Sequence, residues 1–313
     1  MKGAPMSEGF ETLKERIRNL YVLTDRDKQL SADIDDLITN AKECLKGYGT
    51  KRRALFVIGN TNSGKTLSLE QQFASRKEFE PCLNEHGEPT KPFLSMEVPM
   101  KPTSKEFAAA IFRALRLPSK VTGKSEGELY EELQAQLRER GILYIHFDEG
   151  QQIIRANTTK ALQSAQDALR QLLQIKDWPL HIIISGVPPV GDLREGDGQI
   201  KSRSTVRPYE VLQCPADAKW IRHGLKVIAV DNCGMTLADD VLTDDFADRL
   251  CRSSGGAFGT IMEAIKEACL FTVGKGRKTL ELKDFAKRYR QVNGCKPSAN
   301  VFIAEHWREL CSL

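Results

Sequence analysis

The stretch Ala54-Leu-Phe-Val-Ile-Gly-Asn-Thr-Asn-Ser-Gly-Lys-Thr66 joins a short apolar run directly to a glycine-rich loop. The run Ala54–Ile58 is typical of a parallel strand that is buried on both faces. The loop Gly59–Thr66 matches the pattern G-x-x-x-x-G-K-[ST] at every fixed position, and helical sequence follows it. A strand, this loop and a helix in that order form the context in which the pattern binds phosphate groups. The sequence therefore predicts a nucleotide site at residues 59–66, here called the phosphate loop.

Each part of the phosphate loop has a predicted role. The residues whose backbone N–H groups are expected to face the phosphates are Gly59, Asn60, Thr61, Asn62, Ser63 and Gly64. Lys65 is expected to reach the β- and γ-phosphates, and the hydroxyl of Thr66 to bind Mg²⁺. The predicted cofactors are ATP and Mg²⁺.

Outward from this loop, strands and helices alternate along the chain. Further apolar runs occur at Phe93–Val98, Ile142–Phe147 and His181–Ser185, and a fifth strand is expected at Tyr209–Gln213. The helical stretches between them are Lys105–Leu115, Glu126–Arg138 and Thr159–Ile175. This alternation predicts an α/β core with a five-stranded parallel sheet.

The strand at Ile142–Phe147 ends in two adjacent acids, Asp148 and Glu149. Because the strand ends at the carboxyl edge of the sheet, Asp148 is expected to hold the water shell of Mg²⁺ there. Glu149 is expected to polarise an attacking water as general base, which favours hydrolysis over phosphoryl transfer to a small acceptor. His146, inside the strand, is interpreted as a hydrogen-bonded core residue.

Polar residues after the next strand offer further candidates. Ser185 either hydrogen-bonds the lytic water or the phosphate, or is an ordinary serine at a strand end. An arginine before the fifth strand is expected to reach the nucleotide of a neighbouring subunit and neutralise transition-state charge there. Arg203 is preferred for this role, then Arg207, with Arg194 as a third candidate.

Helical patterns flank the core on both sides. Residues 1–50 are interpreted as an N-terminal helical segment, 51–214 as the α/β core, 215–292 as an all-helical lid, and 293–313 as a tail with a helix at Ala299–Leu310. These boundaries rest on the hydrophobic periodicity of the helical stretches and on the glycines between them.

Composition excludes several classes of protein. The 313 residues are 41% hydrophobic and 28% charged, which is typical of a globular chain. No apolar run approaches the ~18 residues of a membrane helix, and no secretory signal is visible. The eight cysteines contain no C-x-x-C pair, which favours reduced thiols in a cytoplasmic protein without a membrane partner.

Positive charge is concentrated in two blocks, although the net charge is only +4. The block at 101–124 holds six bases against Glu106, and the block at 271–296 holds eight against Glu281 and Asp284. Such patches are typical of polyanion binders, and the alternative is a pair of solvated surfaces.

A phosphate loop, an Asp-Glu strand, a polar fourth strand, arginines before a fifth strand and a helical lid together resemble an AAA+ ATPase. Within that superfamily the chain resembles the TniB/TnsC group of ATP-dependent regulators of DNA transposition, over roughly residues 10–290. The segments that carry the closer resemblance are Leu23-Thr-Asp-Arg-Asp27, Gly59–Thr66, Phe147-Asp-Glu-Gly150, Ser185-Gly-Val-Pro-Pro-Val-Gly191 and Gly255-Gly-Ala-Phe-Gly259. One departure is that many AAA+ lids carry an arginine where this chain has Gly259 and Thr260, so hydrolysis is expected to be slow or stimulated by a partner.

The resemblance implies a bacterial, mobile-element protein that forms a ring or helical filament on duplex DNA with ATP. The resemblance implies that it then recruits a transposase to that site, and whether a dedicated target-selector protein also takes part stays open. The block at 101–124 is the preferred sequence-nonspecific DNA contact, through Lys101, Lys120, Thr122 and Lys124, with the 271–296 block as the rival. Two other functions stay open: a helicase-loader-type ATPase, and a non-hydrolysing scaffold that ATP holds together on DNA.

Overall fold

The computed structural model describes residues 9–83, 87–118, 123–154 and 158–311, and it divides into two units. The α/β unit consists of Asp25–Thr61 and Lys65–Tyr209. The helical unit consists of the described part of Met1–Thr24, of Asn62–Gly64 and of the described part of Glu210–Leu313. In the described part of the chain, no helix is long and apolar enough to span a membrane.

The α/β unit contains a sheet of five parallel strands, which confirms the predicted fold class. The strands are β1 (Ala54–Gly59), β4 (Phe93–Glu97), β5 (Tyr144–Asp148), β6 (His181–Gly186) and β7 (Ser204–Tyr209). Their order across the sheet is β4-β5-β6-β1-β7. Because all five are parallel, the phosphate loop after β1 and the acids that end β5 lie at the same edge, with β6 between them.

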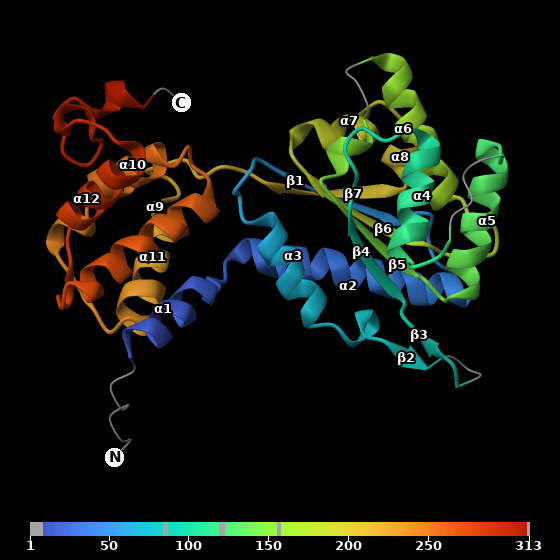
Figure 1. The fold of residues 1–313 in the computed structure, drawn as a ribbon, viewed down its shortest axis with the longest axis horizontal. Coiled ribbons are helices and arrows are strands. Elements are labelled where there is room, and N and C mark those ends of the chain that lie inside the picture. The colour runs from blue at the N-terminus through green and yellow to red at the C-terminus, as the bar shows by residue number, and fades with distance from the viewer. Residues whose placement is uncertain (1–8, 84–86, 119–122, 155–157, 312–313) are drawn as a thin grey trace. The chain divides into compact units, whose positions relative to one another are not determined.

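Helices cover both faces of this sheet (Figure 1). The helices are α2 (Asp25–Leu45) and α3 (Lys65–Ala74) on one face, and α4 (Ser104–Ala114), α5 (Glu126–Glu139) and α6 (Thr159–Leu173) on the other. Alternate residues of β1 divide between the two layers, since Leu55 and Val57 pack with α2 and α3 while Phe56 packs with α4–α6. Because helices cover both faces of the sheet, the side chains on both sides of each inner strand are buried, which requires continuous apolar sequence along the strand.

The fifth strand differs from the prediction. It runs from Ser204 to Tyr209 and pairs with β1, so the expected strand at Tyr209–Gln213 is wrong in its bounds. Leu212 instead bonds to Gly256 of the helical unit through its N–H, 2.8 Å from the glycine carbonyl oxygen, and packs in that unit's core. The apolar residues after Tyr209 therefore serve the helical unit and not the sheet.

Short elements complete the α/β unit. They are the hairpin β2 (Cys82–Leu83) and β3 (Pro89–Thr90), the helices α7 (Asp192–Glu195) and α8 (Gly198–Ser202), and the 3₁₀ turns η1 (Lys77–Phe79), η2 (Gly150–Ile153) and η3 (Pro188–Gly191). The turn η2 follows the two acids of β5, and α8 leads into β7.

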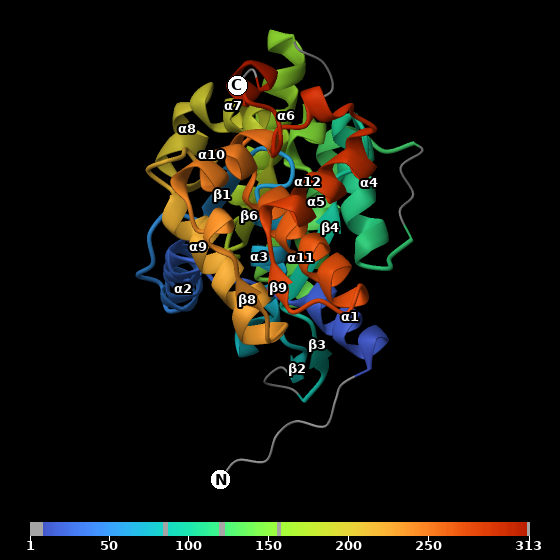
Figure 2. The same cartoon turned by 90° about the vertical axis from the view of Figure 1, so that its left-hand side faces the viewer.

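The helical unit, whose helices and short strands are labelled in Figure 2, has its own hydrophobic core. Its helices are α1 (Phe10–Asn19), α9 (Ala218–Leu225), the π-helical η4 (Lys226–Asn232), α10 (Asp244–Ser253), α11 (Phe258–Gly274) and α12 (Leu282–Asn293), with the 3₁₀ turn η5 (Asp239–Val241). Helix α1 packs against α11, and Ile17 of α1 is buried in this core. A two-residue parallel pair, β8 (Thr236–Leu237) with β9 (Thr279–Leu280), corrects the expectation that this region is all-helical.

The predicted helix at Ala299–Leu310 is wrong. The segment holds two 3₁₀ turns, η6 (Pro297–Ala299) and η7 (Trp307–Leu310). Between them, Asn300 donates from its side chain to the Ala286 carbonyl oxygen at 2.7 Å and accepts from the Phe302 N–H at 3.0 Å. An asparagine side chain that bonds the backbone in this way competes with helix formation. Val301, Phe302 and Trp307 of the tail are buried, with Trp307 1% exposed, whereas Ile303 and Leu310 are exposed.

Candidate active site

The phosphate loop curls around its own lysine. Lys65, the first residue of α3, donates from Nζ to the carbonyl oxygens of Gly59 at 2.7 Å and Asn60 at 2.9 Å. The backbone has positive φ at Asn62 (59°) and Gly64 (95°), and the second of these values favours glycine. The lysine that the sequence predicts for phosphate binding is therefore positioned by the loop that carries it.

The structure brings the two predicted acids to this lysine. Burial lowers the pKa of Lys65, while the negative charges of Glu149 and Asp148 act on it in the opposite direction. Asp148 is the last residue of β5, Glu149 follows it directly, and Lys65 begins α3; all three belong to the α/β unit. An ammonium group and two carboxylates therefore lie close together at this edge of the parallel sheet, and their roles toward phosphate and Mg²⁺ stay predictions.

One oxygen of Asp148 is already engaged by the protein. Its Oδ1 accepts a hydrogen bond from Ser185 Oγ at 2.6 Å and another from the Glu149 N–H at 2.9 Å. Ser185 is fully buried on β6. The structure therefore places the serine against the aspartate carboxylate, an arrangement that neither interpretation of Ser185 in the sequence included.

Glu149 has a left-handed backbone conformation, with φ 54° and ψ 39°. The chain turns sharply here, and a Cβ atom on Gly150 would lie 2.3 Å from Ile184 Cγ2. The glycine after the two acids is thus required by the close approach of β6. Strained backbone of this kind is often found where a functional side chain is aimed.

Gln151 is a residue that the sequence reasoning missed. Its side-chain amide donates to the Glu149 carboxylate, and its Oε1 accepts from the Val187 N–H at 3.2 Å. The amide thereby links the candidate base to the end of β6. Nothing in the spacing of the sequence predicts this contact, because it depends on how η2 folds back over the neighbouring strand.

His146 has partners on both ring nitrogens. Nδ1 lies 2.9 Å from Ser95 Oγ and Nε2 lies 2.8 Å from Ser185 Oγ. Burial lowers the pKa of His146 to about 4, with the negative charge of Asp148 acting in the opposite direction. The ring is therefore neutral at pH 7 and is a hydrogen-bonded core residue, as expected from its place in the strand.

The predicted metal-binding residues supply oxygen donors only. Thr66 is exposed on the first turn of α3, and Asp148 offers a carboxylate. Hydroxyl and carboxylate oxygens suit Mg²⁺, which usually keeps several waters and binds substrate phosphates. Within the described residues no group of three His, Cys, Asp or Glu side chains is placed to hold a metal. The residues therefore fit a Mg²⁺ ion held mainly by phosphates and water.

The three candidate arginines have different surroundings. Arg207 forms a bidentate ion pair with Asp33 of α2, at 2.5 and 2.9 Å. Arg194 donates to Ser204 Oγ at 3.0 Å and pairs with Glu195. Arg203 donates to the Gln199 carbonyl oxygen at 3.3 Å and has no ion pair with any described residue. Of the three guanidinium groups, that of Arg203 therefore makes the fewest interactions with the described residues.

The basic block at 101–124 is only partly described. Lys101 is exposed, follows the 80% exposed Met100, and has a backbone φ of 48°. Lys124 pairs with Glu132, and its carbonyl oxygen accepts from Lys105 Nζ at 2.6 Å. Lys120 and Thr122 lie outside the described residues. The structure therefore shows Lys101 as an exposed cation and Lys124 as a paired one.

In the rival block at 271–296, several basic side chains form ion pairs with acids of the helical unit. Arg277 pairs with Asp284 and Glu281, and Lys283 also pairs with Glu281. Arg288 pairs with Glu267. Three of the eight bases in this block, Arg277, Lys283 and Arg288, are thus paired with acids of the same unit.

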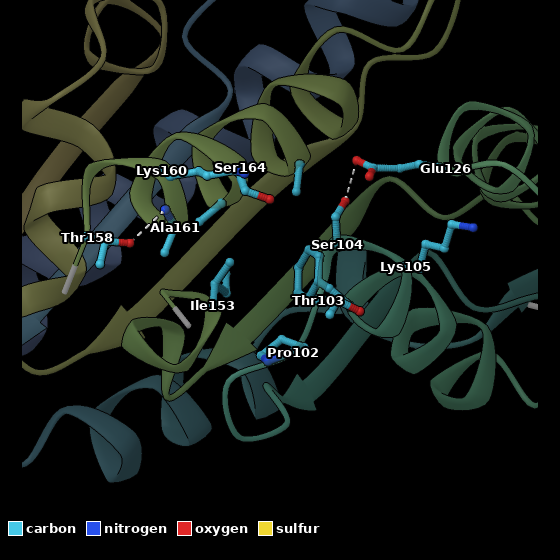
Figure 3. A pocket seen from close by; sticks show the side chains of 13 residues that line it. Pro102, Thr103, Ser104, Lys105, Glu126, Ile153, Thr158, Lys160, Ala161 and Ser164 are labelled. Carbon is cyan, nitrogen blue, oxygen red and sulfur yellow. Dashed lines mark hydrogen bonds between the residues drawn. The ribbon is translucent and has the colours of Figure 1, made fainter. Parts of the chain in front are cut away.

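A cavity of about 570 Å³ lies beside the 101–124 block (Figure 3). Its lining includes Pro102, Lys105, Glu126, Ile153 and Lys160. Ser104 Oγ donates to Glu126 at 2.7 Å across its rim. No residue of the phosphate loop lines this cavity, so it is separate from the candidate nucleotide site.

Solved structures share this fold. Cdc6p from Pyrobaculum aerophilum matches with a TM-score of 0.57 and 15% identity, covering 89% of this chain and 71% of its own. The ORC2 protein from Aeropyrum pernix, solved as ADPNP-ADP complexes, matches with a TM-score of 0.53 and 16% identity, covering 91% and 75%. At these identities the likeness establishes the fold alone.

No curated protein has a sequence that matches the chain. A family model described as "Bacterial TniB protein" matches residues 23–213, which is more than half of the chain. The match extends from just before α2 to just after β7 and contains the phosphate loop, both acids and Ser185. The expected resemblance is thus confirmed, and the chain belongs to the TniB family, the TnsC-like AAA+ proteins of DNA transposition.

Proposed function

We propose that the protein is an ATPase that assembles on duplex DNA and regulates transposition by marking the target site for a transposase. The observation that carries this proposal is the meeting of Lys65, Asp148 and Glu149 at one edge of the sheet in a TniB-family chain. ATP is the proposed substrate, and hydrolysis is proposed to be slow or stimulated by a partner. The bacterial cytoplasm is the proposed compartment.

In this proposal the chain's own groups divide the work of hydrolysis. The loop N–H groups and Lys65 hold the phosphates, and the N-terminus of α3 favours their negative charge. Glu149 takes a proton from the attacking water, and Asp148 orients waters through its carboxylate. When bound beside Thr66 and Asp148, Mg²⁺ supplies charge neutralisation at the phosphate oxygens.

Assembly is proposed to complete the site. Arg203, which has no ion pair with a described residue, is the proposed residue that reaches the nucleotide of a neighbouring copy. A homo-oligomer, either a ring or a helical filament, follows from a site that needs a group from the next subunit.

Sequence-nonspecific DNA binding is proposed for the block at 101–124. The exposure of Lys101 supports this choice, and the ion pairs within 271–296 weigh against the rival. Lysines that contact phosphates fix position on the duplex but read no bases. A transposase is the proposed protein partner, with a target-selector protein as a further candidate.

The Glu149→Gln variant tests the proposed hydrolysis. Glutamine keeps the shape of the side chain and cannot accept the proton, so we expect turnover to fall by about 10²–10⁴-fold with nucleotide and DNA binding retained. Steady-state phosphate release and fluorescence-detected nucleotide binding measure the two properties. Parental turnover in Glu149→Gln would contradict the assignment of the base.

The same assay, run with and without duplex DNA, separates the proposed function from a non-hydrolysing scaffold. A scaffold would bind ATP and assemble on DNA with no turnover in either condition. Pull-down of a replicative helicase in place of a transposase would favour the loader function.

A further inference from the structure

A row of hydrogen-bonded polar side chains crosses three adjacent strands of the sheet. It begins at Ser95 on the edge strand β4, passes through His146 on β5 and Ser185 on β6, and ends at Asp148. The contacts are 2.9 Å from Ser95 Oγ to His146 Nδ1, 2.8 Å from His146 Nε2 to Ser185 Oγ, and 2.6 Å from Ser185 Oγ to Asp148 Oδ1. Every link lies within the α/β unit.

The direction of each hydrogen bond follows from the chemistry of the groups. An ionised carboxylate only accepts, so Ser185 gives its single hydroxyl proton to Asp148. His146 Nε2 must then be the donor to Ser185 Oγ, because that serine has no second proton to give. In a neutral imidazole the other nitrogen is an acceptor, so Nδ1 accepts from the Ser95 hydroxyl.

The imidazole has little freedom to break this arrangement. His146 is 4% exposed, and its ring lies against the ring of Phe73 on α3, with centroids 4.9 Å apart. A buried polar ring is costly unless it is fully hydrogen-bonded, whereas an apolar side chain would fill the same place without that requirement. Packing alone therefore does not account for this row of hydrogen-bonded polar side chains.

We propose that His146 is a positioning residue of the nucleotide site, which acts through Ser185 on Asp148. Its Nε2–H fixes the Ser185 hydroxyl so that the serine proton is committed to Oδ1 of Asp148. With the Glu149 N–H also bound to Oδ1, the carboxylate is held in one orientation, and Oδ2 is the oxygen available to the Mg²⁺ water shell. Ser185 then supports the aspartate and does not donate to phosphate. This inference rests on the proposed ATPase function.

Nucleotide binding with and without Mg²⁺ tests the proposal. In His146→Leu the donor to Ser185 is lost, so we expect the gain in ATP affinity on adding Mg²⁺ to shrink by about tenfold. Affinity in EDTA stays within about twofold, because Lys65 and the loop are untouched. The probe is a fluorescent ATP analogue titrated in MgCl₂ and in EDTA. In His146→Gln, whose amide can donate to Ser185, we expect most of the Mg²⁺ effect to return.

Two comparisons give the experiment its controls. The Ser185→Ala variant and the His146→Leu/Ser185→Ala double variant should lose the same Mg²⁺ effect, because the histidine acts only through the serine. His181→Gln changes the other buried histidine of the sheet and should leave the Mg²⁺ effect intact. An unchanged Mg²⁺ effect in His146→Leu, or additive losses in the double variant, would overturn the proposal.

The tautomer of His146 gives a readout that does not depend on a folded variant. In ¹⁵N-histidine-labelled parental protein, the ring of His146 should be protonated at Nε2 and unprotonated at Nδ1, with its signal identified by its absence in His146→Gln. A neutral ring protonated at Nδ1 would refute the inference. Failure of the parental protein to bind ATP in either buffer would instead refute the proposed function and leave the tautomer result readable.

Discussion

Single residues at the carboxyl edge of the sheet are held by the backbone of their own loops. Lys65 donates to two carbonyl oxygens of the phosphate loop, Asp148 Oδ1 accepts from the next backbone N–H, and Glu149 occupies a left-handed conformation. Such contacts fix side chains before any substrate arrives, which is the usual condition for electrostatic catalysis. Single substitutions at this edge are therefore expected to change function more than stability.

The first prediction at this scale concerns Lys65→Ala. The substitution removes the cation expected to face the β- and γ-phosphates, and we expect ATP affinity to fall about a hundredfold, corresponding to ~3 kcal/mol. Calorimetric titration with ATP measures it. Circular dichroism should show the parental fold, and ATP affinity within threefold of the parental value would contradict the role of Lys65.

The second prediction concerns His181, at the opposite end of β6. Its Nδ1 lies 2.7 Å from the Pro179 carbonyl oxygen and its Nε2 lies 2.9 Å from Asn40 Nδ2, so Nδ1 donates and Nε2 accepts. Burial lowers the pKa of His181 from 6.5 to about 4. Between these values the unfolded chain binds the proton more readily than the folded protein, so stability is full above pH 6.5 and is lost as pH falls toward 4.

We therefore expect the free energy of unfolding to fall by about 2 kcal/mol more between pH 7 and pH 5 in the parental protein than in His181→Gln. Urea denaturation at the two pH values measures this difference. Equal pH dependence in the two proteins would show that His181 is not buried in its neutral form.

At the scale of elements, helix α2 is anchored to the sheet by polar contacts as well as apolar ones. Arg207 of β7 pairs with Asp33, and Asn40 bonds His181 of β6. Asp27 accepts from Ser68 of α3 at 2.5 Å. The arginine that sequence reasoning considered for a neighbouring nucleotide is thus used to hold a helix of its own chain.

The prediction for this element compares two arginines near the same strand. We expect Arg207→Ala to lower the free energy of unfolding by about 1–2 kcal/mol, because Asp33 is left partly buried without its partner. Arg203→Ala should leave stability within about 0.5 kcal/mol, since that residue has only a carbonyl contact, but should impair ATP-dependent assembly. Denaturation curves and light scattering with ATP measure the two effects.

Mixing variants makes the comparison sharper. Arg203→Ala combined with Lys65→Ala should recover some turnover, because one copy keeps the nucleotide site and the other keeps the arginine. No recovery with Arg203→Ala, together with recovery when Arg207→Ala takes its place, would move the proposed role to Arg207.

At the scale of the whole molecule, the basic blocks of the two units differ in the ion pairs that their side chains form. In the α/β unit Lys101 is exposed beyond β4, whereas in the helical unit Arg277, Lys283 and Arg288 are paired with acids. Since counterion release depends on unbalanced cations near DNA phosphates, the two blocks should differ in their effect on DNA binding.

The prediction for DNA binding compares Lys101→Ala/Lys120→Ala with Lys275→Ala/Lys278→Ala, which remove equal charge from the two blocks. We expect the first pair to flatten the slope of log K against log salt by ~0.9 for each lysine that binds a DNA phosphate in the parental protein. Affinity should fall by a similar factor on unrelated DNA sequences, with ATP binding retained. Fluorescence anisotropy with labelled duplexes measures the slopes, and weaker DNA binding only in the second pair would place the DNA-binding surface in the helical unit.

The sequence by itself determined the α/β core, the phosphate loop and the acids after β5, because each depends on residues that are adjacent along the chain. An apolar run, a loop pattern and an Asp-Glu pair are local signals, and the parallel sheet aligns their ends. The tertiary structure alone decided which side chains meet across strands: Ser95, His146 and Ser185 come from three separate segments, and Arg207 is paired with Asp33 of a distant helix. The tertiary structure also decided that the fifth strand begins at Ser204, because pairing with β1 sets its bounds. In the tail, the side chain of Asn300 bonds to the backbone and competes with the helix that local apolar periodicity predicts.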